Sequence, residues 1–101
     1  MSERCELEIR VPEEHPAFAG HFPGAPVAPA VLLLDLLLEA LETRLGYALH
    51  AEALPHAKFM APLKPGDSAR AIIELDGRQV RFRLEAAGRP AASGVMVLGP
   101  S

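Results

Sequence analysis

The sequence has little of several features that mark out particular classes of protein. Its 101 residues include one cysteine, Cys5, which cannot form a disulfide within the chain and fits a reducing cytoplasm. No basic segment followed by an apolar stretch indicates a signal peptide. The leucine-rich run from Val31 to Leu38 is too short and too charged to cross a bilayer core of about 30 Å. We therefore expect a cytoplasmic protein without a membrane span.

Charge and missing motifs argue against further classes. The formal net charge of −3 disfavours nucleic acid as the main partner. The four histidines form no i, i+4 pair and have no cysteine cluster beside them, so we expect no metal site. The GxSxG, GxGxxG and P-loop sequences are absent, which disfavours a serine-hydrolase elbow and the usual nucleotide sites. Charge is also unevenly distributed along the chain. Residues 1–53 hold nine acidic and three basic side chains, whereas residues 54–101 hold four acidic and seven basic side chains.

The residue pattern predicts a single α+β domain over residues 1–101. Apolar and charged residues alternate from Cys5 to Val11, which predicts a half-buried strand. Helix formers from Val31 to Leu45, apolar on most sides, predict a buried helix that ends at Gly46. Strands are then expected at residues 52–63, 69–75, 79–86 and 91–98, with turns at residues 64–67, 76–77 and 88–90. The expected architecture is a curved antiparallel sheet wrapped around one central helix.

Asp35 is the most informative candidate for chemistry. Leucines precede and follow it in the helix, and desolvation among them would favour the protonated carboxyl that serves as a general acid. The alternative is that Asp35, Glu39 and Glu42, at positions i, i+4 and i+7, form the solvated stripe of an amphipathic helix. The pattern alone favours this alternative.

Three further groups in the chain are candidates for catalysis or binding. His21 lies in a loop stiffened by proline and glycine, where an imidazole can act as a base, although an ordinary loop histidine is the commoner case. The first backbone N–H groups of the helix, those of Ala30 and Val31, can hold an oxyanion, as in any helix. Arg81 and Arg83 can form a docking patch for an acidic partner, whereas a solvated outer sheet face is the more frequent reading.

Two segments resemble one known family. "FAGHFPGAPVAPAVLLLD", residues 18–35, closely resembles the signature of the hot-dog-fold β-hydroxyacyl-acyl-carrier-protein dehydratases of the FabA/FabZ type. "KFMAPLKPGD", residues 58–67, is similar to a second motif of that family, and both occur in the family's order and separation. The resemblance covers most of the chain from Cys5 onward. The segment "HPAFAGHFPG" is similar in sequence to the short dehydratases of aryl-polyene pathways.

This resemblance implies a function and assigns residues to it. The implied activity is 3-hydroxyacyl-[acyl-carrier-protein] dehydration in fatty-acid or polyene-type synthesis, with no cofactor other than the phosphopantetheine of the acyl carrier protein. It implies that His21 is the base, Asp35 the acid, and the N–H groups of Ala30 and Val31 the donors to the thioester carbonyl. It further implies a homodimer with active sites at the interface.

Two departures from the family pattern keep alternatives open. Ala30 stands where the family has glycine, and Glu39 stands where it commonly has glutamine, so Glu39 is a candidate modulator of Asp35. One alternative is a non-catalytic hot-dog subunit that binds acyl chains or completes a heterodimer. A lesser alternative is an acyl thioesterase. The docking of the carrier to Arg81 and Arg83 is a further expectation.

Overall fold

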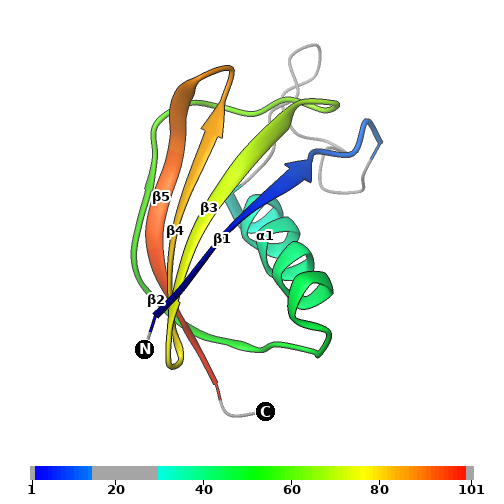
Figure 1. Ribbon diagram of the computed structural model, residues 1–101. Coiled ribbons are helices and arrows are strands. Elements are labelled where there is room, and N and C mark those ends of the chain that lie inside the picture. The colour runs from blue at the N-terminus through cyan, green and yellow to red at the C-terminus, as the bar shows by residue number, and fades with distance from the viewer. Residues whose placement is uncertain (1, 15–29, 100–101) are drawn as a thin grey trace.

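The computed structural model describes residues 2–14 and 30–99, which contain one helix and five strands (Figure 1). The elements follow the chain in the order β1 (Ser2–Arg10), α1 (Ala30–Leu45), β2 (Ala51–Phe59), β3 (Ser68–Asp76), β4 (Gln79–Ala86) and β5 (Arg89–Leu98). The strands form one antiparallel sheet in the order β1-β3-β4-β5-β2. The sheet curves around α1, so the predicted α+β architecture is confirmed (Figure 1).

Alternation of side chains along the strands gives the sheet one apolar face, which packs on α1. In β4, the residues Val80, Phe82 and Leu84 are buried, while Arg81 and Arg83 point to solvent on the opposite face. The helix contributes four buried leucines to the same core, namely Leu32, Leu33, Leu37 and Leu41. The face of the sheet away from α1 is the outer face of the molecule.

The helix begins and ends close to the predicted residues. Its first residue is Ala30, one position earlier than expected, and Gly46 follows its last turn. Gly46 has a φ of 87°, and its N–H donates a hydrogen bond of 2.8 Å to the carbonyl oxygen of Glu42. A residue without a Cβ adopts this left-handed conformation with little strain, which explains the stop.

The expectation that the helix is buried on most sides is wrong for a single chain. The side chain of Val31 is 70% exposed, and Leu34 and Leu38 are only half-buried. The sheet is too narrow to enclose the whole helix, so one stripe of α1 faces outward beside β2. No helix in the described ranges has the length and apolar character needed to span a membrane.

The turn between β4 and β5 lies earlier than the predicted Gly88–Pro90. Ala87 and Gly88 have φ values of 53° and 74°, as a two-residue type I′ turn requires, so Arg89 and Pro90 open β5. Pro90 is tolerated there because a strand start can lack one N–H donor, and the register shifts between Leu84 and Glu85 opposite it.

The predicted turn at Lys64–Asp67 is confirmed and is tied to β1. The Asp67 carboxylate accepts a hydrogen bond of 2.8 Å from the N–H of Lys64, and Gly66 has a φ of 87°. Val11 binds this turn twice, donating to the Asp67 carbonyl and accepting from the Gly66 N–H, both at 2.8 Å. The preceding segment was expected to be strand as far as Leu63, but β2 ends at Phe59.

The edge strand β2 is irregular and exposed along its whole length. Its register with β5 shifts between Ala51 and His56, around Pro55, which has no N–H to donate. In the regular half, Ala57 lies opposite Gly94, and a Cβ on that glycine would stand 2.5 Å from the carbonyl oxygen of His56. The backbones of β2 and β5 therefore approach each other closely at Gly94.

Candidate active-site groove

A groove of about 300 Å³ runs between α1 and β2 on the helix side of the sheet. Four residues of α1 line it, namely Val31, Leu34, Asp35 and Leu38, together with residues 51–54 of β2 and Met96 of β5. Asp35 and Glu52 are the only acidic residues in this lining. The groove is therefore an apolar channel with a carboxylate on each wall, open to solvent in the single chain.

Asp35 projects from the stripe of α1 that the sheet leaves uncovered. Residues three and four apart share a helix face, so Val31 and Leu38 lie on either side of Asp35 along the groove. Its side chain is exposed in the single chain, as the solvated-stripe alternative expects. Yet the other helix residues that line the groove are apolar, which is what a general acid beside an acyl chain requires.

The first turn of α1 lies beside a second apolar hollow, of about 330 Å³. Ala30 and Leu33 line it from the helix, and the end of β2 and the following connection supply Phe59 and residues 60–63. Because α1 begins at Ala30, the N–H groups of Ala30 and Val31 belong to the first turn and have no acceptor within the helix. Donors for an oxyanion thus lie one turn from Asp35.

The other two acids of the helix differ in their surroundings. Glu39 is exposed and lies outside the groove lining. Glu42 is half-buried, and its carboxylate accepts a hydrogen bond of 2.7 Å from the N–H of Leu49 in the connection to β2. The solvated stripe predicted for all three acids therefore ends at Glu39.

Glu52 is a groove residue that the sequence did not single out. It lies on β2 and approaches Arg78 of the β3–β4 turn, with 4.0 Å between its Oε2 and the arginine Nη1. No motif marks it, because its position opposite α1 depends on how the sheet curves.

His21, the predicted base, lies outside the described residues. Arg81 and Arg83, the predicted docking residues, lie on the outer face of the sheet beside a hollow of about 360 Å³. Arg4, His56 and Ser93 also line that hollow. The structure thus separates these arginines from the groove, because the sheet lies between them.

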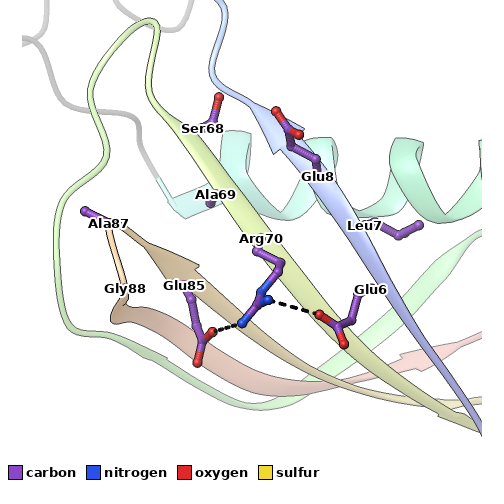
Figure 2. A pocket seen from close by; sticks show the side chains of 9 residues that line it. All are labelled: Glu6, Leu7, Glu8, Ser68, Ala69, Arg70, Glu85, Ala87 and Gly88. Atoms are coloured by element: carbon purple, nitrogen blue, oxygen red, sulfur yellow. Dashed lines mark hydrogen bonds and ion pairs between the residues drawn. The ribbon is translucent and has the colours of Figure 1, made fainter.

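A larger hollow, about 570 Å³, lies at another part of the outer face and holds a cross-strand ion-pair network (Figure 2). Arg70 of β3 stands between two glutamates, at 2.9 Å from Glu85 of β4 and 3.4 Å from Glu6 of β1. The hydrogen bond from Arg70, aided by Arg83, holds the pKa of Glu85 below its ordinary value against partial desolvation. Each charge is already matched, so the network links strands and offers no free chemical group.

In the part of the chain that the structure describes, no three residues among histidine, cysteine, aspartate and glutamate are grouped so as to hold an ion.

The strand order and the curved sheet packed on α1 define a hot-dog fold. The solved structure of the dehydratase heterocomplex ApeI:P from Xenorhabdus doucetiae matches with a TM-score of 0.80 at 23% identity, over 99% of this chain and 95% of that one. That likeness establishes the fold.

Sequence comparison gives the family. The family model described as ApeI-like, ApeI dehydratase, matches residues 1–95. The 3-hydroxyacyl-[acyl-carrier-protein] dehydratase FabZ of Thiobacillus denitrificans is 34% identical over 108 residues, which cover 96% of this chain and 73% of the relative. The FabZ of Chlamydia trachomatis serovar L2 is 44% identical over 61 residues, and the match spans only 40% of that protein. The chain belongs to the ApeI-like dehydratase family.

Proposed function

We propose that this protein is a 3-hydroxyacyl-[acyl-carrier-protein] dehydratase, which eliminates water to give the trans-2-enoyl thioester in fatty-acid or polyene-type synthesis. The observation that carries the proposal is Asp35, a carboxylate on the apolar groove one turn inside the start of α1. Family membership supports the same activity. We place the reaction in the cytoplasm.

The reaction needs three groups, and each has a candidate in this chain. A base, assigned to His21, removes the proton from the carbon next to the thioester. Electron density moves toward the thioester oxygen, which accepts hydrogen bonds from the N–H groups of Ala30 and Val31. As the double bond forms, Asp35 gives its proton to the β-hydroxyl, which leaves as water. No cofactor is required, because the base, the hydrogen-bond donors and the acid account for every proton and electron pair in these reaction steps.

A second copy of the chain would complete the groove. Four of the five large apolar side chains exposed in the described residues line the two hollows beside α1, namely Val31, Leu54, Phe59 and Met60. An exposed edge strand next to an apolar seam is a surface for association. We propose a homodimer in which the partner covers this seam and removes water from around Asp35.

The acyl chain arrives on a carrier protein in this proposal. Arg81 and Arg83 are candidate docking residues because their outer face is more basic than the rest of an acidic chain. Their ion pairs with Glu74 and Glu85, at 3.9 and 3.4 Å, are exposed and easily exchanged for carboxylates of an acidic carrier.

The test is turnover of a 3-hydroxyacyl thioester of acyl carrier protein, with the enoyl product followed by mass. We expect His21→Ala and Asp35→Asn each to lower kcat by about 10²- to 10⁴-fold, because a positioned acid or base usually contributes this much to the rate. Glu39→Gln is the matched control, since it removes a carboxylate on the same helix outside the groove. If Glu39 modulates the acid, its variant keeps activity and shifts the pH profile.

A second candidate is a subunit that is silent until it meets a different hot-dog partner. Ala30 in place of glycine favours it, since a methyl group there crowds the thioester, and the Xenorhabdus structure is described as a heterocomplex. An inert wild type that is folded and dimeric would contradict the first proposal. Restored turnover on mixing with a partner would support the second.

A further inference from the structure

Two basic residues of β2, His56 and Lys58, lie on the outer face of the sheet and do not line the groove. Lys58 pairs with Ser93 of β5, and Ser93 pairs with Arg83 of β4. Paired residues of antiparallel strands project from the same face of a sheet, so Lys58 stands on the face that carries Arg83. His56 occupies the corresponding position two residues earlier on β2, and it lines the hollow of about 360 Å³ together with Arg83.

The outer face therefore holds two parallel pairs of basic side chains, with β5 between them. Arg81 and Arg83 form one pair on β4, and His56 and Lys58 form the other on β2. We call these four residues the basic frame. Two residues on the same face of a strand are about 6.6 Å apart along it, and two strand spacings separate the pairs by about 9.6 Å.

The strand inside the basic frame supplies only small side chains. Ser93 and Val95 of β5 lie between the two pairs, and both are half-buried. The ion pairs of the frame within the described residues are those of its two arginines with Glu74 and Glu85, at 3.9 and 3.4 Å. The charge of Lys58 is thus offset by no carboxylate in the described part of the chain.

An α-helix with acidic residues on two flanks matches the dimensions of the basic frame. Carboxylates at positions i and i+4 are about 6 Å apart along a helix, which is close to the spacing within each pair. Successive residues point about 100° apart, so positions i and i+1 are roughly 8 Å apart across a helix about 11 Å wide. Such a helix can lie along β5 with one row of acids over each pair, whereas an extended acidic segment reaches one pair only.

We propose that His56 and Lys58 complete a docking surface for an acidic α-helix of the carrier protein, which lies along β5 between β4 and β2. The inference rests on the proposed function only for the identity of the protein that supplies the helix. It adds a second row of contacts, and an orientation, to the docking proposed for Arg81 and Arg83. Because all four side chains are exposed, their attraction for the helix is screened by salt.

The experiment measures the binding of apo acyl carrier protein, which bears no acyl group, to the purified full chain by fluorescence anisotropy at low ionic strength. Lys58→Glu should raise Kd at least about fivefold, because one exposed ion pair is lost and a repulsion is gained. His56→Glu should act in the same direction. Lys58→Arg keeps the charge and should keep Kd within about twofold of the wild type.

Lys64→Glu is the matched control, since Lys64 is an exposed lysine in the turn before β3 and lies outside the basic frame. Its Kd should also stay within about twofold of the wild type. An equal rise in Kd for Lys58→Glu and Lys64→Glu would overturn the inference, because it would show that the carrier senses only the net charge of the chain. An unchanged Kd for Lys58→Glu would overturn it as well.

Two synthetic helical peptides test the shape of the partner. One carries glutamates at positions i, i+1, i+4 and i+5, and the other carries the same number spread around the helix. The first should bind more tightly, and Lys58→Glu should remove its advantage. Equal affinity of the two peptides for the wild type would overturn the inference. A chain that binds the carrier through the basic frame but does not dehydrate 3-hydroxyacyl thioesters would instead contradict the proposed function alone.

Discussion

Gly94 shows how a single residue decides whether β2 can pair with the sheet. A side chain there would meet the His56 carbonyl oxygen at 2.5 Å and the Phe82 ring at 2.8 Å, distances that real Cβ atoms do not show. Backbone on one side and a buried ring on the other leave little freedom to adjust.

We expect Gly94→Ala to lower the free energy of unfolding by about 1–3 kcal/mol, the usual cost of forcing atoms into a packed site. Urea denaturation measures the change as a shift of the midpoint. Ser93→Ala, its neighbour on the outer face, is the control and should stay within about 0.5 kcal/mol. An unchanged midpoint for Gly94→Ala would mean that β2 does not approach β5 so closely.

Glu85 supplies a prediction about acid. Its pKa is lowered in the folded chain, first by the hydrogen bond from Arg70 (Figure 2). A group whose folded pKa lies below its unfolded value adds stability above the unfolded pKa and loses it as pH falls through the folded pKa. We expect Arg70→Ala to raise the pKa of Glu85 toward its ordinary value, as read by carboxyl chemical shifts in an NMR titration.

At the scale of elements, α1 and β2 are the two that a single chain leaves incomplete. The run of helix formers and the stop signal at Gly46 placed both ends of α1 within one residue, because these preferences act locally on the backbone. The burial of α1 could not be predicted in the same way. Apolar residues lie on most sides of α1, so the sequence does not show which side is buried. The curvature of the sheet decides which stripe of the helix is covered.

We expect Leu54→Lys to weaken the proposed homodimer at least tenfold, because a charge on the apolar seam must be desolvated on association. Sedimentation velocity over a range of concentrations measures the dissociation constant. Tyr47→Lys is the control, since Tyr47 is 57% exposed but lines neither hollow of the seam. Equal dissociation constants for both variants would place the interface elsewhere.

At the scale of the whole molecule, the groove and the outer hollow beside Arg81 and Arg83 differ in charge. The groove side carries Asp35 and Glu52, and the outer hollow carries Arg4, Arg81 and Arg83 with one glutamate, Glu74. A net-negative chain with a basic outer hollow is suited to an acidic carrier that docks apart from the chemical groups.

We expect the double variant Arg81→Glu and Arg83→Glu to raise KM for a carrier-borne substrate about tenfold or more. The same acyl group on free pantetheine should keep its KM, because it makes no contact with the outer face. Arg89→Glu, a charge reversal outside the hollow, is the control. A KM that rises equally for both substrates would point to a damaged groove rather than lost docking.

The sequence by itself determined most of the elements and singled out Asp35 as the candidate acid. The residue pattern predicted the bounds of β4 correctly, and Gly46 and the Lys64–Asp67 turn marked ends that local backbone chemistry imposes. The prediction failed where the local sequence signal was ambiguous. Pro90 was predicted to lie in a turn, but it lies at the start of β5. His21 stays a prediction, carried by its motif.

Only the tertiary structure decided what surrounds Asp35. Residues 51–54 and Met96 lie far from it in sequence, and they meet it because β2 returns along α1 and β5 lies next to β2. The same folding gave Glu42 a partner and set Glu52 on the opposite wall, neither of which any spacing along the chain could reveal. Local signals define strands and helices through the backbone, whereas a groove is made by long-range contacts, whose partners depend on the curvature and order of the sheet.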